Sequence, residues 1–189
     1  VPLKTFIHSF YMIDGQKMSK SSGNVISPSQ LIDAFGVDGA RYLVATSFPR
    51  ENDSDVGIGK YKERYNADLA NNLGNLVSRL AKMGQGLKIE TTANEYDLDV
   101  KNLIDELKFN EAVLLIFEKW INPVNLKLNE QEPWKKDFED KTRQELLRWA
   151  SGELKRAAYH LMPFIPETSQ TIIDLFTKEI KTPKEGLFK

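Results

Sequence analysis

The sequence predicts a mainly α-helical protein: an antiparallel helical bundle preceded by a short strand-loop-helix segment. From about residue 60 onward, apolar residues recur every three or four positions, the spacing of amphipathic helices. The loops that separate these apolar stripes are short, which favours antiparallel neighbours in a bundle. Before residue 60 the pattern differs, because residues 5–13 are rich in β-branched and aromatic side chains, as strands are.

The first fifty residues predict one strand and two short helices. Asp14-Gly15 follows the strand and is a strong tight-turn pair. Ser27-Pro28 supplies a cap and a first-turn proline for a helix that Gly36 closes, and a second helix follows from Val37. These elements are too few to close a parallel sheet with both faces covered. We therefore expect the amino terminus to be cut from something larger.

Residues 49–59 are polar and contain glycine, which predicts a connector between two modules, residues 1–58 and 59–189. A long amphipathic helix is expected next, ending near Gly84. Its apolar stripe consists of Tyr61, Tyr65, Leu69, Leu73, Leu76 and Leu80.

Four further helices are predicted, over 100–107, from Phe109 to about 131, over 141–162 and over 167–176, with a loop over 91–99. Pro123 lies inside the second of them. A proline in a helix interior removes a backbone hydrogen bond, so we expect a kink between residues 120 and 124. Glu132-Pro133 should end that helix. Trp120 and Trp149 fall on apolar faces and are assigned to packing.

Composition restricts the possible functions. The 189 residues carry 26 basic and 27 acidic side chains, a net charge of −1, so any nucleic acid must be met by a local patch. Cysteine is absent, which excludes disulfides and thiolate catalysis, and two scattered histidines predict no metal site. No apolar run approaches the roughly 20 residues of a membrane span, and no targeting segment is evident. A cytoplasmic location is expected.

The run from Gln16 to Asn24 has the composition of a phosphate-binding loop. Lys17 and Lys20 provide cations, Ser19 and Ser21 provide hydroxyl donors, and Met18 lies between them. A glycine at position 23 lets the backbone turn close to a ligand. A solvated turn would use the same residue types.

Three residues of the bundle are candidates for nucleic-acid contact. Asn75 and Arg79 lie four apart on one helix face beside the leucine stripe, where an amide and a guanidinium can bind base edges or stack on a base. The alternative is an ordinary cap or surface ion pair. Trp134 follows a proline at a helix end, where its ring is either a stacking platform or part of the core.

The order of these residues resembles a known family. Residues 17–21, Lys-Met-Ser-Lys-Ser, match the signature of class I aminoacyl-tRNA synthetases letter for letter. Residues 65–79 resemble the opening helix of the anticodon-binding domain in methionyl-tRNA synthetases. Residues 129–134 and 163–168 are similar to that family as well, so the resemblance covers nearly the whole chain.

The resemblance implies a carboxy-terminal part of a methionyl-tRNA synthetase, a ligase that attaches methionine to tRNA(Met) with ATP and Mg²⁺. It implies that Lys17 and Lys20 are catalytic, that residues 17–21 bind ATP, and that Asn75, Arg79 and Trp134 recognise the CAU anticodon. Residues 1–58 would end a Rossmann-like catalytic domain, and 59–189 would be the anticodon-binding bundle. The partner motif His-x-Gly-His and the methionine pocket are missing from the sequence, so the chain alone is expected to make no adenylate.

The chain departs from the family pattern at Leu126, Lys127 and Pro123, close to Trp134 in sequence. Two alternatives remain at this point. A synthetase for leucine, isoleucine, valine or cysteine shares the loop and a helical anticodon domain. A naturally truncated paralogue could bind tRNA without catalysis, although the Val1-Pro2 start without an initiator methionine favours an artificial truncation.

Overall fold

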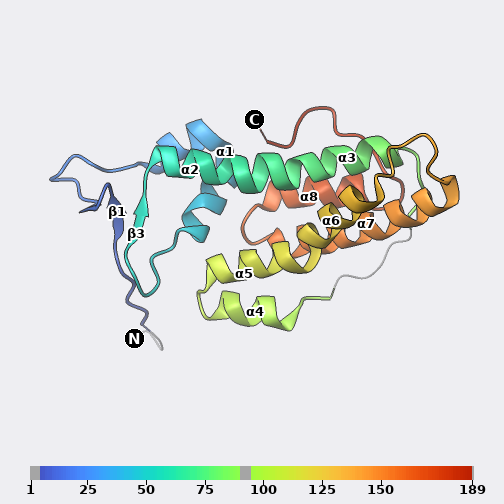
Figure 1. Ribbon diagram of the computed structural model, residues 1–189. Helices are drawn as coiled ribbons and strands as arrows, with labels where there is room; N and C mark the ends of the chain where they lie inside the picture. Colours follow the sequence, from blue (N-terminus) through green and yellow to red (C-terminus); the bar gives the residue numbers. More distant parts are fainter. Residues whose placement is uncertain (1–4, 90–94, 189) are drawn as a thin grey trace.

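The computed structural model describes residues 5–89 and 95–188 and places a small sheet at one end of an elongated set of helices (Figure 1). The sheet has the order β2-β1-β3. Strand β1 (Tyr11–Ile13) pairs antiparallel with β2 (Gln16–Lys17) and parallel with β3 (Ser54–Val56). Of the predicted strand over 5–13, only the last three residues are in the sheet.

The β1–β2 hairpin has the predicted tight turn. Asp14 and Gly15 adopt φ angles of 51° and 74°, and two consecutive residues with positive φ are what a two-residue hairpin loop demands. Asp55 in β3 holds the turn, because its carboxylate accepts hydrogen bonds from the backbone N–H groups of both turn residues. The Lys60 ammonium, 2.8 Å from Asp55, together with these N–H groups keeps the pKa of the carboxyl below its ordinary value.

The prediction that residues 49–59 form a connector was wrong in part, because β3 lies within this segment. The strand is three residues long, and of its side chains only that of Val56 is buried. Three residues are too few to display a period of two. The strand forms because β1, about forty residues earlier, offers it a parallel edge.

Helix α1 (Pro28–Thr46) contains both short helices predicted from the sequence. Ser27 and Gln30 form a capping box at its start, with proline in the first turn. Gly36 has φ 71° and ψ 173° inside the helix, so the predicted boundary at this glycine is confirmed. A residue with a side chain would be strained in that conformation.

The predicted long helix is present as one run from residue 58 to 84, in three consecutive parts. These are α2 (Ile58–Arg64), a π-helical stretch η1 (Tyr65–Gly74) and α3 (Asn75–Gly84). The whole predicted stripe of tyrosines and leucines is buried. The spacing of the apolar residues thus identified the buried face of this helix. It did not reveal that residues 65–74 are π-helical.

Helix α4 (Leu98–Asp105) begins two residues before its predicted start, and residues 91–94 of the expected loop lie outside the described residues. Helix α5 (Phe109–Ile116) continues through a π-helical turn, η2 (Phe117–Ile121), into α6 (Asn122–Gln131). The π turn ends two residues before Pro123, inside the segment where the kink is expected, and π turns and prolines are both places where helices bend. The kink between residues 120 and 124 stays a prediction.

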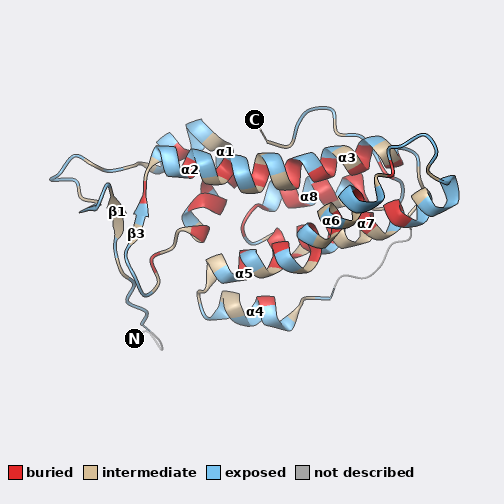
Figure 2. Ribbon diagram, viewed as in Figure 1, coloured by how far each residue is buried: buried red, intermediate tan, exposed pale blue. Residues whose placement is uncertain are grey.

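Glu132 adopts the left-handed conformation, with φ 46°, and ends α6 before Pro133 as predicted. Helices α7 (Asp140–Leu161) and α8 (Pro166–Leu175) complete the bundle. Figure 2 shows buried residues on the helix faces that are turned towards one another. Trp120 is among them, whereas Trp149 is half-buried and lies under the Lys127 ammonium, 4.3 Å from its ring centre.

Within residues 5–89 and 95–188, none of the helices has both the length and the apolar character needed to cross a membrane. The same residues contain no cluster of three or more histidine or acidic side chains arranged to hold a metal ion.

Two helical glycines allow a matched test of packing. At Gly39 in α1 an added Cβ would lie 2.8 Å from Cε2 of Tyr65 and 3.0 Å from Cβ of Phe35, whereas at Gly152 in α7 it would meet nothing within 4 Å. We expect Gly39→Ala to lower the free energy of unfolding by about 1–3 kcal/mol through overpacking. Gly152→Ala should raise it by about 0.4–1 kcal/mol, since alanine restricts the unfolded chain. Urea denaturation measures both, and equal responses would contradict the close approach of α1 to η1.

His160 in α7 is buried, and its hydrogen bonds are those of a neutral imidazole. Its Nε2 accepts the backbone N–H of Asp97 at 2.8 Å, so its Nδ1 donates to the carbonyl of Arg156 at 2.7 Å. The Trp120 ring stacks on the imidazole with ring centres 4.4 Å apart. Burial lowers the pKa of His160, opposed by the Arg156 carbonyl and the Asp97 carboxylate, and the cations of Lys119 and Arg156 lower it further.

The lowered pKa of His160 predicts a loss of stability in mild acid. Below the unfolded-state pKa of about 6.5, the unfolded chain binds a proton that the folded chain resists, so the free energy of unfolding should fall as the pH drops from 7 to 5.5. His160→Gln removes the titrating group and should flatten this dependence. Chemical denaturation at both pH values tests it, with the exposed His8→Gln as control. An unaltered slope in His160→Gln would contradict the assignment.

Candidate functional site

The loop after β2 is held together by Asn24, a residue that composition did not single out. The Asn24 side chain accepts the backbone N–H of Ser19 at 2.9 Å and donates to the carbonyl of Lys17 at 3.2 Å. The Ser19 hydroxyl lies 2.7 Å from that of Ser22 and 3.2 Å from that of Ser21. The amide thus closes the loop, with three hydroxyls gathered on it.

The two lysines of the loop are both exposed. The Lys17 ammonium lies over the ring of Phe10, 3.4 Å from its centre, an arrangement that fixes a cation without neutralising it. Among the described residues, no ion pair of Lys20 is found. Met18 points the other way and packs against the core. The loop therefore presents two cations and several hydroxyl donors to solvent, which suits a polyanion.

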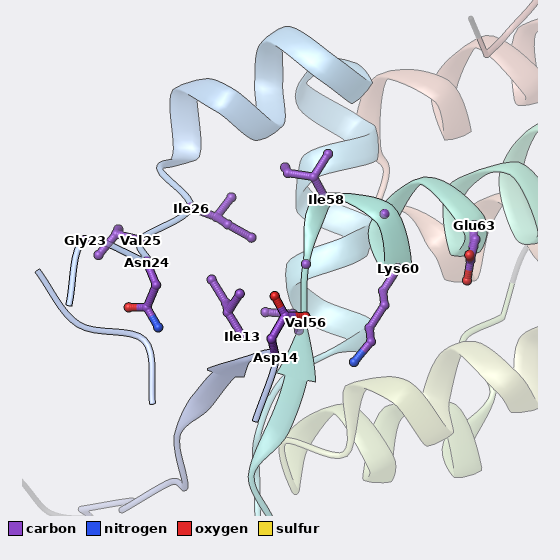
Figure 3. A pocket seen from close by; sticks show the side chains of 12 residues that line it. Ile13, Asp14, Gly23, Asn24, Val25, Ile26, Val56, Ile58, Lys60 and Glu63 are labelled. Carbon is purple, nitrogen blue, oxygen red and sulfur yellow. The ribbon is translucent and has the colours of Figure 1, made fainter. Parts of the chain in front are cut away.

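Two cavities flank this loop. A cleft of 520 Å³ lies between Asn24, the β1 end and the start of α2, and Figure 3 shows Asn24, Ile13 and Lys60 around it. A second cavity, of 440 Å³, is almost entirely apolar and includes Met18 and Tyr11 in its lining. Met18 lines this apolar cavity, which gives a structural reason for an apolar residue between Lys17 and Ser19.

Two of the three candidate residues of the bundle, Arg79 and Trp134, meet at the end of the molecule opposite the sheet, where the turn between α6 and α7 lies beside α3 (Figure 1). The Arg79 guanidinium is 5.0 Å from the centre of the Trp134 ring. Arg79 also donates to the Asn129 side chain in α6 at 3.1 Å. Asn75, one helical turn before Arg79, is exposed.

Trp134 is 49% exposed although it is one of the largest apolar side chains of the chain. An indole that is half-exposed and backed by a guanidinium leaves one surface free for stacking. Of the neighbouring departures from the family pattern, Lys127 lies over the Trp149 ring and Leu126 is 60% exposed. This end of the bundle can therefore offer an aromatic ring, a guanidinium and an amide together.

Three further residues shape these sites and were missed from the sequence: Asn24, Asn129 and Arg143. Asn24 carries a local signal, since an asparagine after a glycine often bonds to its own loop. Asn129 and Arg143 act on partners in other elements, so the sequence carried no local signal for them.

Comparisons with known proteins show what this chain is similar to. Residues 1–81 match the family described as tRNA synthetases class I (M). The chain is 34% identical to the methionine–tRNA ligase of Clostridium acetobutylicum over 202 residues, 96% of this chain and 31% of that protein. It is 31% identical to the corresponding ligase of Brucella suis, over 93% of this chain and 37% of that protein. The chain thus spans about a third of the length of the curated relatives it matches.

Solved structures of Mycobacterium tuberculosis methionyl-tRNA synthetase share the fold. The apo form superposes with a TM-score of 0.76 at 22% identity, covering 100% of this chain and 44% of that one. The complex with methionyl-adenylate superposes with a TM-score of 0.72 at 25% identity, covering 97% of this chain and 43% of that one.

Proposed function

We propose, from the homology of this chain to methionine–tRNA ligases, that it is a carboxy-terminal part of a methionyl-tRNA synthetase. The homology extends over more than nine-tenths of the chain, which supports methionine over leucine, isoleucine, valine or cysteine as the amino acid of the parent protein. The parent would join methionine to tRNA(Met) using ATP and Mg²⁺ in the cytoplasm. Residues 1–58 would belong to its catalytic domain and 59–189 to its anticodon-binding domain.

The bundle end is proposed to recognise the CAU anticodon. The observation that carries this proposal is the contact of the half-exposed Trp134 ring with Arg79, 5.0 Å apart, from different elements of the bundle. Unstacked anticodon bases are recognised by aromatic stacking and by hydrogen bonds to their edges. Trp134 would supply the stacking surface, and Arg79 and Asn75 the hydrogen bonds.

The loop of residues 17–21 is proposed to act on ATP. Negative charge accumulates on the departing pyrophosphate as methionine attacks the α-phosphate, and cations already in position lower that barrier. Lys17, held over Phe10, and the exposed Lys20 suit this role. The chain by itself should not form adenylate, because the relatives it matches are about three times longer.

Binding of RNA to the 189-residue chain tests the proposal. A stem-loop with a CAU anticodon is compared with a matched one carrying CAC at one fixed salt concentration, since affinity for RNA depends on salt. We expect CAU to bind about tenfold more tightly, a difference of about 1.4 kcal/mol. Equal affinity for the two stem-loops would refute anticodon recognition by this chain and favour a paralogue that binds tRNA without reading it.

A further inference from the structure

Arg143 binds the backbone of the turn that carries Trp134. It lies in the first turn of α7, and its Nε donates to the carbonyl of Pro133 at 2.8 Å. Its Nη2 donates to the carbonyls of Lys135 at 3.0 Å and Phe138 at 2.9 Å. Two of these three carbonyls belong to the residues on either side of Trp134.

The energetic setting of Arg143 is unusual for a surface arginine. A cation in the first turn of a helix is disfavoured by the helix dipole. An ion pair with Asp140 in the same turn offsets this cost. The guanidinium has five donors in a planar fork, so it can bind several carbonyls at once, which an ammonium on a flexible stem does not reproduce. Its side chain is only 24% exposed.

The Trp134 turn has little other support from regular structure. It follows the left-handed Glu132 and precedes α7, and its backbone bonds include Lys135 N–H to Glu132 O at 3.0 Å and Phe138 N–H to Lys135 O at 3.3 Å. The Trp134 ring itself contacts Arg79 of α3. Arg143 therefore fixes the backbone of the turn while Arg79 contacts the ring.

We propose that Arg143 is a positioning residue for RNA recognition: it holds residues 133–138 so that the Trp134 ring is presented in a fixed orientation. This rests on the proposed anticodon-binding function. Arg143 contacts no RNA itself in this proposal, since its guanidinium is occupied by the three carbonyls and Asp140.

The effect of Arg143 on the orientation of the Trp134 ring can be tested without RNA. The chain is labelled with 5-fluorotryptophan, and the ¹⁹F signal of Trp134 is identified as the one lost in Trp134→Phe. Arg143→Lys keeps the charge and removes the fork, so we expect this signal to move towards the position of the unfolded chain while those of Trp120 and Trp149 stay in place. The matched control is Arg148→Lys, also in α7, where the arginine donates to the carbonyl of Lys88 outside the turn. An unmoved Trp134 signal in Arg143→Lys would overturn the proposal.

Binding of the CAU stem-loop then tests the consequence by a double-mutant cycle. Arg143→Lys should weaken binding about fivefold, and Arg148→Lys less than about twofold. In the Trp134→Ala background, Arg143→Lys should have almost no further effect, because the ring it positions is gone. The same fivefold loss in both backgrounds would overturn the positioning role and assign Arg143 a direct contact. If the unaltered chain shows no preference for CAU, the anticodon proposal fails, and the ¹⁹F experiment still decides whether Arg143 holds the turn.

Discussion

Replacing Trp134 by alanine is expected to weaken binding of a CAU stem-loop by about 5- to 150-fold and to remove the preference over CAC. Stacking of one base on an aromatic ring contributes about 1–3 kcal/mol, which corresponds to this range. The ring is half-exposed, so its loss should cost little stability. Fluorescence anisotropy of a labelled stem-loop, with the free energy of unfolding measured in parallel, separates a binding defect from a folding defect.

Two variants control for the nature of this effect. Trp134→Phe retains a ring and should keep a substantial part of the affinity. Leu126→Ala removes a similarly exposed apolar side chain, 60% exposed, from the adjacent helix α6 and should leave binding unchanged. If Leu126→Ala weakened binding as much as Trp134→Ala, the contact would be a general apolar one and base stacking would be the wrong explanation.

Replacing Lys20 by alanine in the longer parent protein is expected to slow methionyl-adenylate formation by about 100-fold. Removal of one preorganised group that stabilises developing negative charge costs about 10²- to 10³-fold in rate. Lys20 is exposed on a loop closed by Asn24, so the substitution should not disturb the fold. Methionine-dependent exchange of pyrophosphate into ATP measures the rate.

The matched control is Lys82→Ala, which removes an exposed lysine from α3, away from the loop. Its exchange rate should equal that of the unaltered enzyme. Affinity for the CAU stem-loop should be unchanged in Lys20→Ala, because the loop after β2 and the turn between α6 and α7, which contains Trp134, lie at opposite ends of the molecule (Figure 1). An exchange rate unaffected by Lys20→Ala would refute the role of this lysine.

Most of the helices could be predicted because the residues on their buried faces are apolar and recur every three or four positions along the chain. The stripe from Tyr61 to Leu80 and the apolar positions of α7, such as Leu147 and Leu154, are buried as the period indicated. Helix ends were also predictable where a residue has a restricted backbone, as at Gly36 and before Pro133. These signals lie in neighbouring residues of the chain, so the helices could be predicted without knowing which elements they pack against.

The errors arose where a distant partner decides the local structure. Strand β3 exists because β1 pairs with it in parallel, and its few polar residues resembled a loop. The π-helical turn η2 before Pro123 was missed as well, because neither the proline nor the apolar spacing specifies that winding. Local propensity is a weak prior that tertiary contacts override.

For the two sites, the sequence by itself determined which residue types are available: two lysines and three hydroxyls in one loop, and an asparagine, an arginine and a tryptophan in the bundle. Only the tertiary structure decided which of them meet. It placed Arg79 against Trp134, closed the loop with Asn24, and directed Arg143 to the carbonyls around the tryptophan. Composition and period are properties of neighbouring residues along the chain, whereas the contact of Arg79 with Trp134 joins segments that only the packing of helices brings together. Asn24 and Arg143 bond to partners five to ten residues away along the chain, and the backbone conformation that brings each side chain to those partners is set by the fold.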